Sequence, residues 1–365
     1  MELKKIHISD IGKVVTGKTP RTSIVENYGG DIPFLTPSDD LSYKSVPKTG
    51  KTLTEQGLNE VKNFLLPPHS VCVSCIGTDL GKVVMTSEPT ITNQQFNSII
   101  PNRRFDADFV YYLMTLVGKE LNYLSKTSTA VPIINKSSFS NYEVEVPDLE
   151  TQEKIASILS SLDSKIELNR RINDNLEQQA QALFKAWFVD NAVIDDASVS
   201  DYFIPLRGKN LLTSDAKGGE VPVVAGGLTP SAYHNVANTK APVITISASG
   251  ANAGYVNLWG VPVWSADSSY IDSSVTPHIY FWYNLLKFSQ KNIFDSQTGS
   301  AQPHIYPKHI GDIHIPNLDL DKVADYNKIV TPIYEQITNT QKLNMQLTVT
   351  RDTLLPKLMS GEIKI

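Results

Sequence analysis

The side chains with the most reactive chemistry are few, and their spacing disfavours a metal or redox centre. Cys72 and Cys75 are the only two cysteines, and they form a CxxC inside the run VCVSCIG. A tetrahedral zinc site needs two further soft ligands at matching spacing, and a redox pair needs a helix N-terminus behind it. Neither pattern is visible. We therefore interpret the pair as part of a buried strand, with a metal or redox site as the alternative.

Other catalytic patterns are also missing from the sequence. Of the seven histidines, His304 and His309 are five apart but lack the intervening Glu of a zinc-protease helix. We find no Gly-x-x-x-x-Gly-Lys phosphate loop, no Asn/Asp-Pro-Pro-Tyr methylation motif and no nuclease-like carboxylate pair. We expect no metal and no cofactor bound to this chain. A DNA-modifying enzyme with an unrecognised site is the less favoured alternative.

Side chains of types that contact nucleic acids gather in turn-rich stretches. Long cations and short hydroxyls alternate from Lys18 to Thr22, a mix that reaches phosphate oxygens. Asn93 and Gln94 are amides of the kind that read adenine. The net charge of −5 does not exclude DNA, because groove readers concentrate cations on one face. The candidate DNA-binding residues are Lys13, Lys18, Thr19, Arg21, Thr22, Lys48, Asn93, Gln94, Arg207, Lys209, Tyr233, His234, Ser249 and Asn252.

Each of these residues also has a structural interpretation. The lysines are equally typical of a solvated surface. The amides near Asn93 can bond within a turn, which we favour for them over base reading. Tyr233 and His234 lie in a polar loop, where either can contact a base or pack.

The chain repeats itself at long range, which indicates a duplicated architecture. Leu168-Asn169 recurs as Leu343-Asn344 and Leu183 recurs as Leu358, both 175 residues later. Gly77–Gly81 is echoed by Gly250–Gly254, and Ala130-Val-Pro132 by Ala301-Gln-Pro303. A duplication of this size predicts a pseudo-twofold molecule that touches its target at two places.

The elements that must position these residues form four segments. Short strand-like runs (70–76, 142–146, 222–227 and 242–247) alternate with turn clusters such as 28–33, and helical periodicity covers 106–124 and 278–288. The fold class is α+β: two globular domains, 1–148 and 193–318, separated by two long helices, 149–192 and 319–365.

The two long helices carry apolar seams for one another. Asp148 is a plausible N-cap, and roughly forty residues without Gly or Pro follow. In the second segment we expect the helix from about Thr331, with Pro332 at its first position, Thr340 and Arg351 intruding on the seam, and Pro356 near its end. We predict an antiparallel coiled coil with Leu343 in its stripe. The residues predicted at the interface are Leu159, Leu162, Ile166, Asn169, Leu176, Leu183, Ile337, Asn344, Leu347, Leu354 and Leu358.

Four segments carry a specific resemblance. Residues 150–188 (ETQEKIASILSSLDSKIELNRRINDNLEQQAQALFKAWF) and 354–363 (LLPKLMSGEI) resemble the central and C-terminal conserved helices of the specificity (S) subunits of type I restriction-modification systems. GGDIPFLTPS at 29–38 and TNQQF at 92–96 resemble motifs of their target recognition domains. The match follows the whole chain in order.

The resemblance implies a non-catalytic protein whose two target recognition domains each read half of a bipartite sequence in double-stranded DNA. It also implies that the helices space the half-sites and dock two methyltransferase (M) subunits, through which restriction (R) subunits join. S-adenosylmethionine, ATP and Mg²⁺ belong to those partners. A coiled-coil scaffold without DNA contact is the main competing hypothesis. With no apolar run long enough for a membrane span and no signal peptide, we expect a cytoplasmic protein without a membrane partner.

Overall fold

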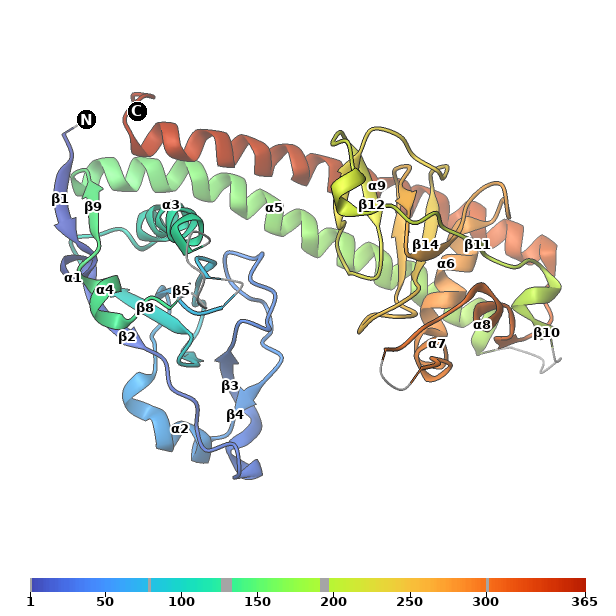
Figure 1. The fold of residues 1–365 in the computed structure, drawn as a ribbon, viewed down its shortest axis with the longest axis horizontal. Coiled ribbons are helices and arrows are strands. Elements are labelled where there is room, and N and C mark those ends of the chain that lie inside the picture. Colours follow the sequence, from blue (N-terminus) through green and yellow to red (C-terminus); the bar gives the residue numbers. More distant parts are fainter. Residues whose placement is uncertain (1, 78–79, 126–132, 191–196, 300–301) are drawn as a thin grey trace. The chain divides into compact units, whose positions relative to one another are not determined.

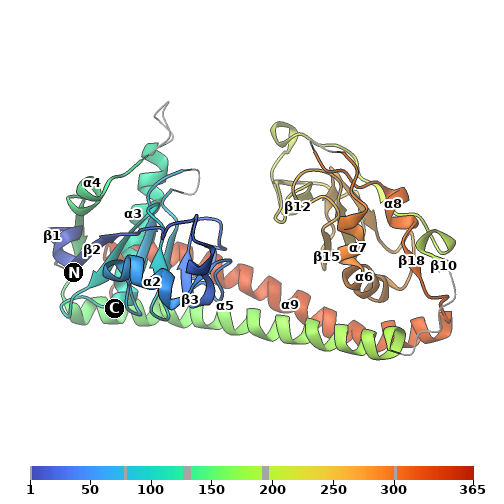
Figure 2. The same ribbon diagram turned by 90° about the horizontal axis from the view of Figure 1, so that it is seen from below.

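The computed structural model describes residues 2–77, 80–125, 133–190, 197–299 and 302–365, and it divides into two compact units. Unit 1 comprises Met1–Glu167 and Met345–Ile365, and unit 2 comprises Leu168–Asn344. The division falls inside both long helices. Each unit therefore combines one mixed α/β module with a part of each helix (Figure 1, Figure 2).

The first module contains a four-stranded antiparallel sheet, a three-stranded mixed sheet and a two-stranded ribbon. The first has the order β2 (Gly12–Thr16), β8 (Phe96–Pro101), β5 (Val71–Ser74), β6 (Val83–Met85). The second has the order β4 (Thr52–Leu53), β3 (Tyr28–Leu35), β7 (Ile91–Thr92), in which β3 and β7 are parallel. The ribbon pairs β1 (Lys4–His7) with β9 (Glu143–Val146).

Helix α3 (Ala107–Ser125) confirms the predicted helix of this module and supplies much of its core. Its apolar face, including Phe109 and Met114, packs with Val71, Val73 and Ile99 of the four-stranded sheet. The shorter helices are α1 (Ile8–Ile11), α2 (Glu55–Val61) and α4 (Lys136–Ser140). Burial of this face stabilises the module, since a fully buried large apolar side chain contributes about 1.5–3 kcal/mol.

The second module repeats the topology of the first strand for strand. Its four-stranded sheet has the order β11 (Leu206–Arg207), β17 (Ser268–Ile271), β14 (Val243–Ser247), β15 (Val256–Trp259). Its three-stranded sheet has the order β13 (Ala232–His234), β12 (Val221–Val224), β16 (Trp264–Ser265). The two-stranded ribbon pairs β10 (Ala197–Ser198) with β18 (His314–Ile315). Again one pair, β12 and β16, is parallel. Helices α6 (Ile279–Phe288), α7 (Gln290–Asp295) and α8 (Pro307–Gly311) complete the module.

Backbone hydrogen bonds confirm the repeat at the level of single residues. Gly81 donates to Ser74 as Gly254 donates to Ser247, each at 2.7–2.8 Å. Both glycines have φ near +88°, which favours glycine over residues with a Cβ. The echo predicted at Ala130–Pro132 lies outside the described residues. The duplication is thus a structural one for the parts that are described.

One predicted turn is a strand. The Gly-Gly-Asp-Ile-Pro stretch has the composition of a turn, but it lies within β3, which pairs with β4 on one side and β7 on the other. The register shifts between Tyr28 and Ile32, and the glycines lie in this irregular part, where Gly29 has a φ of 89°. A β-bulge accounts for glycine inside a strand.

The long helices are α5 (Leu149–Phe184, continued by a π-turn over Lys185–Val189) and α9 (Leu320–Met359). The carboxylate of Asp148 accepts the amide of Thr151, as expected for an N-cap. Within unit 2 the two helices run antiparallel, because residues later in α5 contact residues earlier in α9. The contacts are Asn169 with Asn344, Ala180 with Tyr326, and Trp187 with Lys322.

Helix α9 differs from its prediction in its start and in its seam. It begins at Leu320, so Pro332 lies in its interior, and it continues past Pro356. An internal proline costs about 3 kcal/mol. Burial of Val323, Tyr326 and Val330 outweighs that cost.

The buried stripe of α9 also runs through the two residues expected to interrupt it. Thr340 is buried, and Arg351 is tied to Asp163 of α5. Leu343, placed in the stripe from sequence, is 40% exposed. Its neighbour Asn344 is the residue that meets α5.

Candidate nucleic-acid interface

The loop after β2 is held against the loop before β8, and this contact fixes the position of Lys18. The amide of Lys18 donates to the carbonyl of Thr92 at 2.9 Å, and Gly17 donates to Phe96 at 3.1 Å. A Cβ at Gly17 would overlap the carbonyl oxygens of Thr92 and Asn93. Only glycine therefore permits this close approach. Lys18 itself is exposed, with its ammonium 5.5 Å from the centre of the Phe64 ring.

The amides near this turn differ in what they can offer a ligand. Asn93 is half-buried: its side chain donates to Gln95 Oε1 and accepts the Gln95 amide, which is the turn-bonding role favoured for it from sequence. Gln94 is exposed, and its Oε1 accepts the hydroxyl of Thr19 at 2.7 Å. This contact uses the carbonyl oxygen of the Gln94 side chain, whose NH₂ group is a donor of the type that pairs with base edges.

Arg21, predicted from sequence to contact phosphates, is paired with a carboxylate of its own module. Its Nε and Nη2 donate to Glu60 Oε1 at 3.1 and 2.9 Å, and its backbone amide donates to Oε2 at 3.0 Å. These hydrogen bonds lower the pKa of Glu60 to about 2. The positive charge of Arg21 is thus balanced within the module. Thr22, next to it, is exposed.

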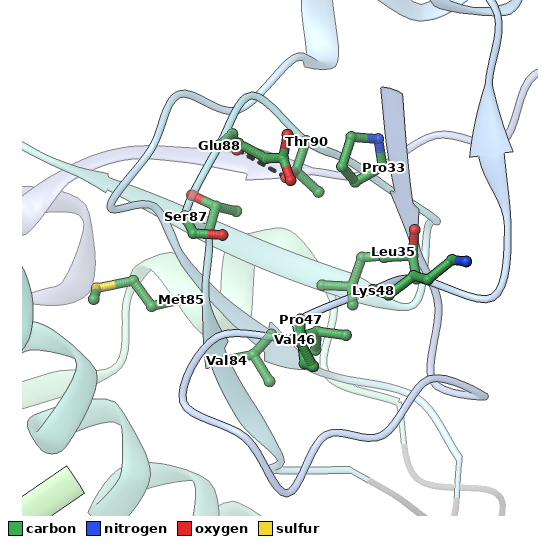
Figure 3. Close-up of a pocket in the computed structure, with 12 residues that line it drawn as sticks. Pro33, Leu35, Val46, Pro47, Lys48, Val84, Met85, Ser87, Glu88 and Thr90 are labelled. Carbon is green, nitrogen blue, oxygen red and sulfur yellow. Dashed lines mark hydrogen bonds between the residues drawn. The ribbon is translucent and has the colours of Figure 1, made fainter. Parts of the chain in front are cut away.

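Lys13 and Lys48 lie apart from this turn. Lys13 is exposed on β2, five residues before Lys18, which corresponds to roughly 16 Å along a strand. Lys48 belongs to the loop between β3 and β4, at a cleft that it lines with Ser87 and Glu88 (Figure 3). The cleft encloses about 30 Å³, room for roughly two waters, so an organic ligand does not fit.

The second module builds the same turn at the same place. Lys209 donates its amide to Ser265 at 2.9 Å, and Gly208 donates to Ser268 at 2.9 Å. A Cβ at Gly208 would overlap the carbonyl oxygens of Ser265 and Ala266. Lys209 is exposed, and its carbonyl accepts the indole N–H of Trp264. Lys18 and Lys209 are therefore structurally equivalent cations.

Beside Lys209 the second module carries an ion pair. Arg207 Nη2 donates to Asp267 Oδ1 at 2.6 Å, and the Ser249 hydroxyl donates to Asp267 Oδ2. Three loops meet here: the end of β11, the turn before β17 and the turn after β14. Arg207 and Ser249 were candidates from sequence, but their pairing with Asp267 was not predicted, because Asp267 lies 60 residues from Arg207.

The remaining candidates of the second module are placed differently from one another. Asn252 is partly buried in the β14–β15 turn, where its carbonyl accepts the amide of Tyr255. Tyr233 is 44% exposed on β13. His234 is buried: its Nδ1 accepts the Lys217 amide at 3.1 Å and its ring packs on Trp264. That burial gives His234 a packing role and removes it from a DNA-facing surface.

The predicted interface residues of the helices fall into two groups by burial. Leu159, Ile166, Asn169, Ile337 and Leu358 are buried, whereas Leu162, Leu176, Leu183, Asn344, Leu347 and Leu354 are half-buried. Asn169 Nδ2 donates to Asn344 Oδ1 at 2.7 Å, within unit 2. A paired Asn in an apolar seam is a device that fixes register.

A second polar contact of the helices, in unit 1, was missed from sequence. Asp163 is 8% exposed and accepts from both Tyr112 Oη at 2.5 Å and Arg351 Nη1 at 2.6 Å. Burial and the Asp163 charge raise the pKa of Tyr112, so this phenol remains a proton donor. The signal was available, since opposite charges occupy seam positions on both helices.

Neither cysteine has the environment of a metal ligand or a redox thiol. Cys72 and Cys75 are buried, and burial raises their thiol pKa values to about 12 and 11. Within the described part of the chain, no three His, Cys, Asp or Glu side chains gather as a metal site. No described helix is long and apolar enough to cross a membrane.

Comparisons with known proteins agree on one family. Residues 1–178 match the model of the type I restriction modification DNA specificity domain. The chain is 28% identical to the type I restriction enzyme MjaIX specificity subunit of Methanocaldococcus jannaschii, over 100% of this chain and 94% of that protein. It is 37% identical to the HindI specificity subunit of Haemophilus influenzae, over 46% of this chain and 38% of that protein.

The fold has a counterpart among solved structures. The type I restriction-modification S subunit from M. genitalium aligns over 98% of this chain and 96% of that one, with a TM-score of 0.54 and 20% identity. A likeness at this identity supports the fold alone, with two α+β modules and two long helices.

Proposed function

Because this chain belongs to the specificity subunits of type I restriction-modification systems, we propose that it selects their DNA target, one module reading each half of a bipartite asymmetric sequence. The observation that carries the proposal is the repeated lysine turn. Two modules of one topology present Lys18 and Lys209 at equivalent positions, each beside polar groups that suit base edges. The target is asymmetric because those neighbouring groups differ.

The proposal includes a division of labour with partner subunits. This chain is non-catalytic, two methyltransferase subunits dock on α5 and α9, and restriction subunits join through them. The helices space the half-sites. S-adenosylmethionine, ATP and Mg²⁺ are used by the partners. The helices expose apolar residues such as Ile158 and Val349, which supports docking on this surface. An apolar side chain in water does not stabilise the helix, whereas its burial by a partner subunit would stabilise the complex.

The test is methylation by the reconstituted assembly. The chain alone should neither cut nor methylate DNA, whereas its complex with two methyltransferase subunits should methylate adenines within one split sequence. A gel-shift series on that complex should show affinity falling steeply with salt, as expected for phosphate contacts. Methyl transfer by the isolated chain, or binding that is independent of salt, would contradict the proposal.

A further inference from the structure

The acidic side chain of Asp267 is held in place beside the turn of the second module that carries Lys209. Asp267 is about one-third exposed, and both of its carboxylate oxygens are used: Oδ1 by Arg207 and Oδ2 by the Ser249 hydroxyl. A carboxylate on a DNA-binding surface repels phosphates and therefore weakens binding. Asp267 can offset this cost by restraining the guanidinium of Arg207, to which it is hydrogen-bonded.

We propose that Arg207 reads a guanine in the half-site of the second module and that Asp267 holds it in the reading pose; this inference rests on the proposed function. Arg207 gives one N–H of Nη2 to Asp267, which leaves four of the five guanidinium donors. Its side chain is 42% exposed. A bidentate contact from Arg to guanine O6 and N7 is the commonest specific contact in the major groove.

Preorganisation explains why the carboxylate contributes to reading. A free arginine must lose rotamer freedom when it docks on a base, and a side chain already restrained loses less. Ser249 restrains Asp267 from the β14–β15 turn, so the reading pose is set by the folded module. Arg207 is therefore a specificity-determining residue and Asp267 a positioning residue.

Among the described residues of the first module, no arginine–carboxylate pair stands at the position that corresponds to Arg207 and Asp267. The residue equivalent to Arg207 is Thr16, whose hydroxyl donates to Asn97 at 2.6 Å. Its nearby arginine, Arg21, is 71% exposed and gives both Nε and Nη2 to Glu60, so that this edge of its guanidinium is occupied. We therefore expect arginine-dependent guanine reading from the position of Arg207 and Thr16 in the second half-site alone.

The variants that test this should leave the fold intact. An exposed ion pair contributes little to stability, so Arg207→Ala and Asp267→Asn are expected to fold as the parent does. Lys209→Ala is the matched control, since Lys209 lies two residues away and carries charge without the planar fork. Thermal unfolding of each assembly with its methyltransferase subunits checks that the variants are comparable.

The experiment selects methylated or bound sequences from duplexes randomised in both half-sites. The parent complex should require guanine at one position of the second half-site. Arg207→Ala should lose that preference by roughly 5- to 150-fold, Asp267→Asn should weaken it, and the first half-site should not change. Lys209→Ala should lower binding to all sequences about equally.

Two results would overturn the inference: a second half-site without guanine, or a selected sequence that is identical for the parent and Arg207→Ala. If methylation is lost in a variant, selection by binding alone gives the same readout. Failure of the proposed function has a different signature. In that case the parent complex selects no sequence, and Lys209→Ala leaves salt-dependent binding unchanged.

Discussion

At the scale of single residues, glycines determine where exposed lysines lie, and carboxylates balance the positive charge of arginines. Gly17 and Gly208 allow a loop to lie directly on a neighbouring backbone, so that Lys18 and Lys209 emerge at the same point of each module. Arg21 shows the opposite case, since Glu60 takes its donors. Formal charge in the sequence is therefore a poor guide to which cations reach phosphate.

This contrast predicts different salt dependences for two neighbouring cations. Lys18→Ala should shallow the slope of log affinity against log salt by about one unit, because one phosphate contact is lost. Arg21→Ala should leave the slope unchanged, since its charge is balanced by Glu60. Lys18→Arg, which keeps the charge, is the control. Equal slope changes for Lys18→Ala and Arg21→Ala would contradict the account.

At the scale of elements, the two helices are joined by polar contacts of different kinds in the two units. Unit 2 uses the amide pair Asn169–Asn344, whereas unit 1 uses the buried carboxylate of Asp163, shared by Arg351 and Tyr112 of α3. Asp163 thereby connects three helices of one unit. Such a contact is directional, and it specifies one register where apolar seams tolerate several.

Removal of one partner of this ion pair should be costly, and removal of both should be much less so. Asp163→Asn should destabilise unit 1 by about 3 kcal/mol, because it removes the buried carboxylate from Arg351 and leaves that guanidinium paired with the more exposed Asp352 alone. Asp163→Leu with Arg351→Met should recover most of that loss, since apolar groups replace the pair. Chemical denaturation measures both. A double variant less stable than Asp163→Asn would contradict the prediction.

The elements were largely predictable from sequence, but their pairings were not. Helix α3 and helix α5 follow from apolar periodicity and an Asp N-cap, which are local signals. Strand β3 was taken for a turn because its glycines and proline have turn composition, and only pairing with β4 and β7 makes it a strand. Pro332 similarly suggested a helix start, although tertiary burial carries α9 through it.

The residue types of the candidate site were predictable from sequence, but the hydrogen-bond partners of those residues were not. The sequence identified Lys18, Lys209 and Arg207 as cations in turns. It could not reveal that Arg207 has Asp267 beside it, 60 residues away, or that Arg21 has Glu60, 39 residues away. Pairing across such separations depends on strand order, which no local pattern encodes. Burial of His234 depended on Trp264 for the same reason.

At the scale of the whole molecule, duplication turns one recognition fold into a reader of two half-sites. The modules share sheet orders and turn geometry, while the side chains at their tips differ: Thr19 with Gln94 in one, Arg207 with Asp267 in the other. An asymmetric target requires two modules that share one fold and present different side chains to the DNA. The helices, in this account, determine the separation of the half-sites.

Lengthening the helices should therefore change the spacer alone. Four residues inserted near Asn175 of α5, with four more near Thr340 of α9 to preserve pairing, would extend the helices by about 6 Å. That length is nearly two base pairs at about 3.4 Å each. The variant should methylate the same half-sites with a longer spacer, whereas an unchanged spacer would show that the helices do not set the distance.

Whether each module reads its own half-site can be measured by mapping methylated adenines after a module exchange. The segment Met1–Pro147 would be replaced by the corresponding segment of another specificity subunit, and the complex with its methyltransferase subunits would be assayed on genomic DNA. We predict that one half of the target changes while the other half and the spacer stay the same. Retention of the complete original sequence, or simultaneous change of both halves, would contradict the account.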